Sequence, residues 1–316
     1  MPNLNLLDIA KLNNTDKVVG LIEESVLFTP ELELFPARSV RGTSFMTVKR
    51  TGMPTAGFRA ANAGIAASKS TFAKQLVECF ILSSNVNVDK AVAQAYEDGA
   101  AALEMIEAAG VMKAAMRTVG SQIWYGTSAD ASGFGGIKTF TPKSDATMCL
   151  SSGGSDAGVQ SSVFAVKFGP QDAQLILGNE ASFDLSPFRD ENFLDANNLP
   201  VPGRVANLTA WVGLALNNVN CVKRLCNVGA DTETGDTLTD AKLADLLDLF
   251  PSGYTPDAIL MSRRSRKQLQ KSRTVTLMGQ GTAKPNQQNI APLPTEYEGV
   301  KIIATDSIVN TEAVEA

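Results

Sequence analysis

The feature that most constrains the fold of this chain is a pair of strand-forming segments joined by a long connection. Ser44–Arg50 and Thr71–Leu82 favour strands because they contain many β-branched and aromatic residues. Residues 51–69 connect them; this is too long for a tight turn, and irregular stretches of such length are usually functional. An isolated two-stranded ribbon is only marginally stable in water. We therefore predict that residues 39–82 form a long hairpin whose partner is another copy of the chain; a mobile surface loop is the alternative.

We expect the apolar residues of this hairpin to make most of their contacts with a neighbouring copy. Side chains alternate along a strand, so Val77 and Ile81 share one face of the second arm, and Lys74 and Glu78 share the other. The candidate contact residues in the hairpin are Phe45, Val48, Phe58, Phe72 and Val77.

Residues 89–119 show the clearest helical pattern. Asp89 is the predicted N-cap, and apolar or small residues follow at spacings of four and three, which places them on one stripe. A helix of this length measures about 45 Å, which suggests a strut. The glycines on the stripe predict the close approach of another backbone. The residues of the stripe are Val92, Tyr96, Gly99, Leu103, Ile106 and Gly110.

Residues 141–228 are β-rich. The composition predicts strands at 163–168 and 173–177, separated by Gly169 and Pro170. It also predicts that residues 211–216 and 219–228 form a second pair of strands.

Residues 236–316 change to an α/β pattern. Thr237 or Thr239 is the predicted cap of a helix that ends before a proline. A short buried strand is expected at 258–261, and a final strand at 299–304.

The chain contains no histidine, and this absence excludes several classes of enzyme. It removes Ser-His-Asp and Cys-His catalysis, histidine-ligated metals and histidine acid–base chemistry. Carboxylate catalysis stays open, although one pair points in different directions on a helix and the other set lies in a loop, where solvation or capping is the simpler explanation. We expect no catalytic residue, no cofactor and no metal site. The carboxylates concerned are the pair Glu23 and Glu24, and the set Asp184, Asp190, Glu191 and Asp195.

The four cysteines, Cys79, Cys149, Cys221 and Cys226, form no CxxC pair and match no zinc-site spacing. We expect them to be buried, reduced thiols. No apolar run approaches the ~20 residues that span a bilayer, so no membrane partner is expected.

A basic run, SRRSRKQLQKSR, follows the strand at 258–261. It predicts a helix with Leu269 inward and the cations outward. Arg263, Arg264 and Lys267 are candidate contacts with acidic residues of the next copy. Contact with DNA is the less favoured alternative, because the chain has a net charge of −5, whereas proteins that bind DNA without sequence preference are normally basic.

Four local motifs follow one another between residues 124 and 308, within a resemblance to known proteins that covers roughly residues 40–310. They are an aromatic-glycine step at 124–126 followed by Phe134–Ile137, the strands 211–215 and 222–227, the segment Pro256–Arg263 with Leu269 after it, and Tyr297–Ile302 with Asp306–Ile308. In this order and spacing they resemble the Hong Kong 97-type major capsid proteins of tailed bacteriophages.

The resemblance implies an α+β fold of four parts. The strand pair at 211–227 precedes the last part, whereas a comparable strand follows it in the archetype, so the strand order is expected to be rearranged. The implied parts are an N-terminal arm (1–38), an E-loop hairpin (39–82), a P-domain (83–228) with a spine helix (89–119), and an A-domain (229–316).

The function that the resemblance implies is structural. Copies of the chain would assemble as hexamers and pentamers into an icosahedral shell around a double-stranded DNA genome, without enzymatic activity. Further implied partners are scaffold, portal and cement proteins, and packaged DNA that is enclosed without specific binding. The implied location is the virion, after assembly in the host cytoplasm. An encapsulin-like compartment and, less favoured, an enzyme using carboxylates are the alternatives.

Overall fold

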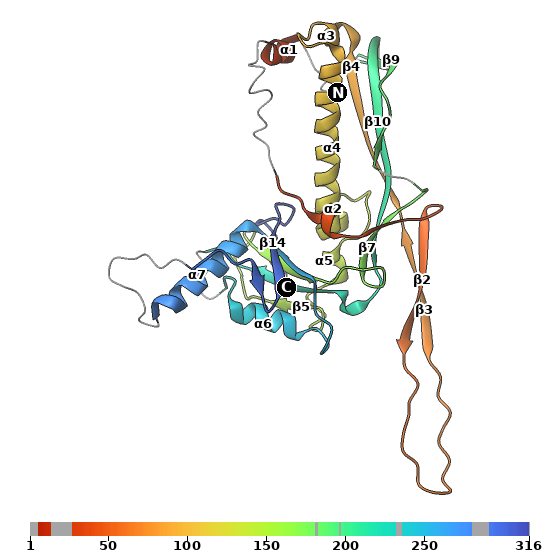
Figure 1. The fold of residues 1–316 in the computed structure, drawn as a ribbon, viewed down its shortest axis with the longest axis vertical. Helices are drawn as coiled ribbons and strands as arrows, with labels where there is room; N and C mark the ends of the chain where they lie inside the picture. Colours follow the sequence, from red (N-terminus) through yellow and green to blue (C-terminus); the bar gives the residue numbers. More distant parts are fainter. Residues whose placement is uncertain are drawn as a thin grey trace.

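A long two-stranded ribbon projects from a body of two lobes, each built on one sheet (Figure 1). The computed structural model describes residues 6–13, 27–180, 183–195, 197–231, 236–279 and 291–315. Within these residues the chain forms two six-stranded sheets and the ribbon. The lobe with the long helix is called the upper lobe below, and the lobe with the C-terminal residues is called the lower lobe, as they lie in Figure 1.

The upper sheet is organised around one long strand, β10 (Pro200–Leu216), which pairs with four others. Its longest partner is β4 (Phe80–Asp89), antiparallel from Gly203↔Asp89 to Val212↔Phe80. The remaining strands are β1 (Ala37–Ser39), β7 (Ala173–Leu177), β8 (Asp184–Leu185) and β9 (Arg189–Leu194).

The predicted helix at 89–119 is interrupted, and this expectation was wrong. Asp89 does act as an N-cap, because its carboxylate accepts a hydrogen bond from the Ala91 amide (2.8 Å), but α3 ends after one turn. The chain breaks at Gly99, whose φ of +91° is incompatible with a right-handed helix. A second helix then runs for 26 residues. The two helices are α3 (Lys90–Gln94) and α4 (Ala100–Tyr125).

The rest of the chain covers only parts of α4. Leu103 is fully buried, but Gly110 is exposed, and a Cβ added there would meet no atom within 4 Å. The buried face is completed further along, by Ala115, Val119 and Ile123. The predicted stripe was therefore wrong at Gly110. This position follows Leu103 by two helical turns on the same face, but no described part of the chain covers it.

The lower sheet combines strands from distant parts of the sequence. Its order is β13-β14-β12-β6-β11-β5. Two helices pack on it through Leu243, Leu246 and Leu269, which are fully buried. The strands are β5 (Cys149–Ser151), β6 (Ser161–Val166), β11 (Val222–Val228), β12 (Ala258–Met261), β13 (Glu296–Tyr297) and β14 (Val300–Ala304), and the helices are α6 (Asp240–Asp248) and α7 (Arg263–Gly279).

Two expected strand arrangements do not occur. β10 and β11 were predicted to pair with each other, but β10 belongs to the upper sheet and β11 to the lower one. β6 and β7 likewise lie in different sheets. The expected domain boundary at 228/229 falls inside the lower sheet, since β11 and β12 flank the same strand, β6. In contrast, the predicted α/β elements of residues 236–316 are confirmed, with Thr239 as the cap of α6.

The N-terminal arm is anchored on both lobes. Ile9 of α1 (Leu6–Leu12) is buried against Val86 and Val88 of the upper sheet. Glu31, at the start of α2 (Glu31–Leu34), accepts a hydrogen bond from the indole of Trp124 (2.8 Å). In the lower lobe, the Phe28 amide donates to Asp306, which follows β14 (2.8 Å). The remaining short helices are the 3-10 helix η1 (Gly126–Ser128), α5 (Ile137–Phe140) and the 3-10 helix η2 (Val219–Cys221).

All four cysteines are buried, as predicted. Burial raises the pKa of the Cys221 thiol to about 12. In the part of the chain that the structure describes, no helix is long and apolar enough to cross a membrane.

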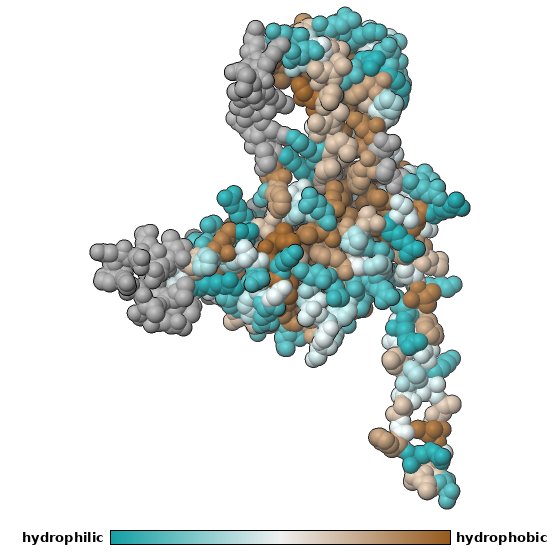
Figure 2. All heavy atoms as spheres, in the orientation of Figure 1, coloured by the Kyte–Doolittle hydropathy of each residue, from teal (hydrophilic) through white to brown (hydrophobic). Residues whose placement is uncertain are grey.

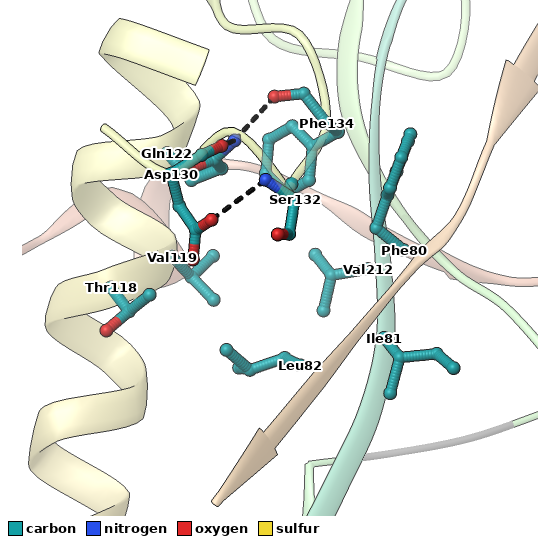
Figure 3. Close-up of a pocket in the computed structure, with 11 residues that line it drawn as sticks. Phe80, Ile81, Leu82, Thr118, Val119, Gln122, Asp130, Ser132, Phe134 and Val212 are labelled. Carbon is teal, nitrogen blue, oxygen red and sulfur yellow. Dashed lines mark hydrogen bonds between the residues drawn. The ribbon is translucent and has the colours of Figure 1, made fainter. Parts of the chain in front are cut away.

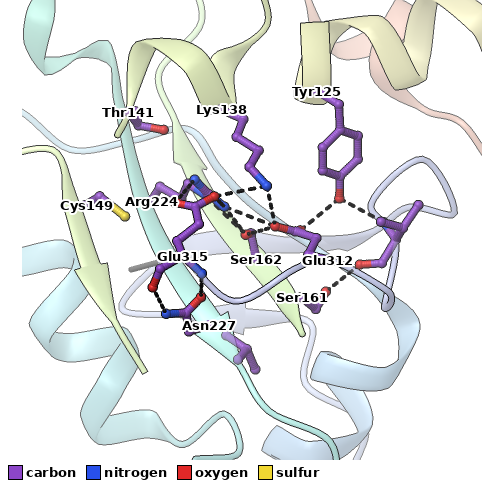
Figure 4. Close-up of polar contacts among 12 residues, drawn as sticks. Tyr125, Lys138, Thr141, Cys149, Ser161, Ser162, Arg224, Asn227, Glu312 and Glu315 are labelled. Atoms are coloured by element: carbon purple, nitrogen blue, oxygen red, sulfur yellow. Dashed lines mark hydrogen bonds and ion pairs between the residues drawn. The ribbon is translucent and has the colours of Figure 1, made fainter. Parts of the chain in front are cut away.

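A buried cluster of charges ties the C-terminal segment to the lower sheet (Figure 4). Arg224 on β11 is fully buried and contacts Glu312 (3.0 Å) and Glu315 (2.7 Å). Lys138 of α5 contacts the same two carboxylates, at 3.4 and 3.0 Å. The hydroxyl of Tyr125, at the end of α4, donates to Glu312 (2.9 Å). The cluster therefore links the long helix, the sheet and the last residues of the chain.

We expect acid to weaken this cluster. Burial alone would raise the pKa of Glu315, but its hydrogen bonds and charge pairs with Arg224 and Lys138 outweigh burial and hold the pKa below its usual 4.5. A carboxylate with a lowered folded-state pKa stabilises the fold above its unfolded-state pKa, and this contribution is lost as the pH falls through the folded value. The unfolding midpoint should therefore drop on acidification below the usual pKa of Glu. Glu315→Gln should be less stable than wild type at neutral pH, and its midpoint should depend less on acid. An equal acid dependence in both proteins would contradict the assignment.

Candidate functional site

The ribbon is the most exposed element of the body and carries most of the predicted site. Its arms are β2 (Ser44–Gly52) and β3 (Thr71–Glu78), paired from Ser44↔Glu78 to Gly52↔Thr71. The second arm is shorter than predicted, because the chain enters β4 of the upper sheet at Phe80. The long connection between the arms contains no helix or strand, as expected.

One face of the ribbon is held by its own chain. The Lys49 ammonium donates to the Leu216 carbonyl (3.0 Å), and the Gln75 amide approaches the same oxygen (3.4 Å). Val77 is buried at the base of the ribbon in a small cluster, with the half-buried Phe45 beside it. Odd-numbered positions therefore face the body.

The opposite face is uncovered and carries four exposed apolar side chains together with Arg50 and Lys74, and Figure 2 shows hydrophobic and hydrophilic residues mixed along the ribbon. Met46 and Leu76 stand directly opposite each other and are 58% and 52% exposed. Val48 and Phe72 on the same face are 64% and 61% exposed, and the Arg50 guanidinium lies 5.5 Å from the centroid of the Phe72 ring. Contiguous exposed apolar surface of this kind marks an interaction site.

The structure divides the predicted ribbon contacts into two groups. Val48, Phe58 and Phe72 are exposed and available to a neighbour. Val77 is buried and Phe45 is half-buried against their own chain, so the prediction that they contact a neighbour is corrected. Met46 and Leu76 are also exposed on this face, and the sequence did not indicate them. The alternation of side chains along the two arms could have indicated them, because the even-numbered residues of both arms share one face.

The cations of the predicted basic run also form two groups, those that bind their own chain and those that are exposed. The guanidinium of Arg264 donates to the backbone carbonyls of Val159 (2.7 Å), Val228 (3.3 Å) and Asn310 (3.3 Å), so it holds its own lobe together and is not available as a contact with the next copy. Lys271 pairs with Asp231 and Arg273 pairs with Asp240, also within the chain. Arg263 and Lys267 are exposed, as predicted, and lie at a groove of about 470 Å³ beside β14.

Three of the carboxylates that could have acted in catalysis, Asp190, Glu191 and Asp195, have structural partners. Asp190 contacts Lys90 and Arg204, both at 3.4 Å, and Glu191 contacts Arg189 (2.6 Å). Asp195 accepts hydrogen bonds from the amides of its own turn at Asn197 and Leu199, both 2.8 Å. Glu23 and Glu24 lie outside the described residues.

A second hollow lies between α4 and β4, near the base of the ribbon (Figure 3). Its volume is about 60 Å³. Pockets for small ligands usually measure about 300–1,000 Å³, so this one is too small for a substrate. Gln122 closes one side by donating to the carbonyl oxygens of Phe134 (2.7 Å) and Asp130 (3.2 Å). The hollow is a packing defect at the foot of the long helix.

Comparison with known proteins identifies the family. The profile of the family described as major capsid protein GP7 matches residues 16–315. A comparison with curated proteins finds no match. Among solved structures, a chain of bacteriophage Epsilon15 superimposes with a TM-score of 0.72 at 18% identity, covering 99% of this chain and 97% of that one. A chain of the bacteriophage JBD30 capsid superimposes with a TM-score of 0.53 at 14% identity, covering 95% and 97%.

These matches confirm the fold that the motifs implied, over nearly the whole chain. It follows that the chain belongs to the major capsid protein GP7 family and is a structural subunit of a tailed-phage capsid with the Hong Kong 97-like fold.

Proposed function

We propose that the chain assembles as hexamers and pentamers into an icosahedral shell around a double-stranded DNA genome, and that the ribbon joins neighbouring copies. The observation that carries this proposal is the exposed apolar face at Met46, Val48, Phe72 and Leu76. Half-burial of each of these side chains would contribute on the order of 1 kcal/mol. Association costs about 4–15 kcal/mol, so one ribbon is not sufficient and several contacts must form together. A closed shell supplies that repetition.

The charge of the ribbon indicates what it meets. Residues 44–78, which form the ribbon and its connection, contain five lysines and arginines and one glutamate, a net charge of +4. The whole chain has a net charge of −5, so the remainder carries −9, the difference between −5 and +4. Ribbons therefore repel one another and are attracted to the bodies of other copies. Since exposed charges are screened by salt, the assembly rate should fall as ionic strength rises.

The same charge balance bears on the other partners. An acidic shell subunit can enclose DNA without binding it specifically, which suits packaging. Scaffold, portal and cement proteins, and assembly in the host cytoplasm, belong to the proposal through the family alone. An encapsulin-like compartment would use the same surfaces, and the contents of purified shells distinguish it from a phage capsid.

The ribbon face can be tested with a double substitution. Met46→Ser with Leu76→Ser removes the central apolar pair without touching the face that contacts Leu216. We expect the subunit to keep its unfolding midpoint and to lose assembly, measured by sedimentation. Met105→Ser on α4 is the control, because Met105 is similarly exposed (74%) but lies away from the ribbon. Equal loss of assembly in the control would show that general surface hydrophobicity, and not the ribbon face, is responsible.

A further inference from the structure

The groove beside β14 combines an apolar floor with a positive rim. Ile302, Ile303 and Leu293 are among its apolar lining residues. Arg263, Arg266 and Lys267 of α7 also line it. The single carboxylate in the lining, Asp306, is already occupied, because it accepts a hydrogen bond from the Phe28 amide (2.8 Å). The groove therefore suits an acidic, partly apolar segment.

The three cations lie at the N-terminal end of α7, where the helix dipole disfavours positive charge. Arg263 and Arg266 lie in the first turn of α7, and Lys267 follows directly. The N-terminal end of a helix has a partial positive charge, so cations there are unfavourable, and this turn contains no acidic residue to compensate them. In the part of the chain that the structure describes, no ion pair is formed by any of the three, and Lys267 contacts only the Gln270 amide oxygen (3.2 Å).

The C-terminal turn of α6 has the opposite character. Asp245 and Asp248 are exposed in this turn, and no basic residue accompanies them. The C-terminal end of a helix carries a partial negative charge, so these carboxylates are also disfavoured by their own helix. Neither forms an ion pair with another described residue. The described part of the chain thus contains an uncompensated negative turn and an uncompensated positive groove.

The two surfaces do not meet within the described part of one copy, although α6 contacts α7 and its Asp240 pairs with Arg273. The buried residues Leu243 and Leu246 fix α6 in the cluster that also contains Leu225 and Val228 of β11, while the groove lies at β14. β12 and β6 separate these strands, a distance of three strand spacings or roughly 14 Å. Two different surfaces that match only between copies form a head-to-tail contact, and such contacts generate rings when the rotation closes.

We propose that the groove formed by Arg263, Arg266 and Lys267 receives the Asp245–Asp248 turn of α6 from the next copy, and that this contact sets the direction of subunits around each capsomer. This inference rests on the proposed shell function and specifies a second interface, separate from the ribbon.

Charge exchange tests the contact in the full chain. One variant carries Arg263→Glu and Lys267→Glu, a second carries Asp245→Lys and Asp248→Lys, and a third carries all four changes. We expect each double variant to reduce the assembled fraction about tenfold, which corresponds to about 1.4 kcal/mol per contact set. The quadruple variant restores opposite charges across the contact and should assemble to within about threefold of wild type. All unassembled subunits should keep the wild-type unfolding midpoint.

Several results would overturn the inference. Normal assembly of both double variants would show that the groove is not a contact, and failure of the quadruple variant to recover would show that the two surfaces do not meet. Salt-sensitive binding of duplex DNA by the wild type, lost only in Arg263→Glu/Lys267→Glu, together with normal assembly of the Asp245→Lys/Asp248→Lys variant, would assign the groove to DNA. If wild-type chain does not assemble at all, the proposed shell function fails, and not merely this interface.

Discussion

Replacing Arg224 with methionine is expected to lower the free energy of unfolding by about 3–5 kcal/mol, because removal of one partner leaves buried charges unpaired. The Arg224 side chain is fully buried, and its guanidinium contacts both Glu312 and Glu315. Methionine fills much of the volume but offers no donor. Chemical denaturation of the unassembled subunit measures the effect.

The control for this variant is Arg41→Met. Arg41 pairs with Glu180 in an exposed position, where both side chains are more than half accessible to water. Solvent screens such a pair, so the change in stability should be far smaller. If Arg224→Met is no less stable than Arg41→Met, the cluster does not hold the C-terminal segment in place.

Gly126→Ala is expected to destabilise the subunit by about 2–5 kcal/mol, from about 1–2 for the left-handed conformation and about 1–3 for overpacking. Gly126 ends α4 with a φ of +56°, and a Cβ there would lie 2.0 Å from the Gly136 backbone nitrogen. The contact is reciprocal, since a Cβ on Gly136 would lie 2.3 Å from the Gly126 nitrogen. The two glycines allow α5 to pack directly against the end of the long helix.

Gly110→Ala provides the opposite expectation. Gly110 is exposed in the middle of α4 with open space around its Cα. Alanine is favoured over glycine in a helix, so the unassembled subunit should gain about 0.5–1 kcal/mol. A loss of stability at this position, or a neutral result at Gly126, would show that the helix is packed differently.

The sequence predicted individual strands and helices better than it predicted which strands pair with each other. The strands β2, β3, β12 and β14 were found because alternation and β-branched residues report on neighbours along the chain. Pairing is decided by residues far away: β10 joins β4 across more than a hundred residues, and nothing in its own pattern distinguishes β4 from β11. The break at Gly99 was missed for a related reason, because glycine is tolerated inside helices and only its φ of +91° reveals the interruption.

The candidate site was predicted in outline and not in detail. The length of the connection between β2 and β3 was sufficient to predict an element that needs a partner. The sequence could not predict which face of the ribbon is exposed, because Val77 and Met46 are both apolar. Only the packing against β10 shows that Val77 is the buried one. Arg264 likewise cannot be distinguished from Arg263 by sequence, since the carbonyls that bind it belong to residues 159, 228 and 310.

The central claim is that this chain builds a shell and that the ribbon joins its copies. Negative-stain electron microscopy of the purified full chain, beside a chain that lacks residues 51–69, tests it most directly. The deletion removes the connection and leaves most of both arms in place. We expect closed shells or capsomers from the full chain and a folded, unassembled subunit from the deletion. A full chain that stays monomeric under all assembly conditions, or normal shells formed without residues 51–69, would contradict the account.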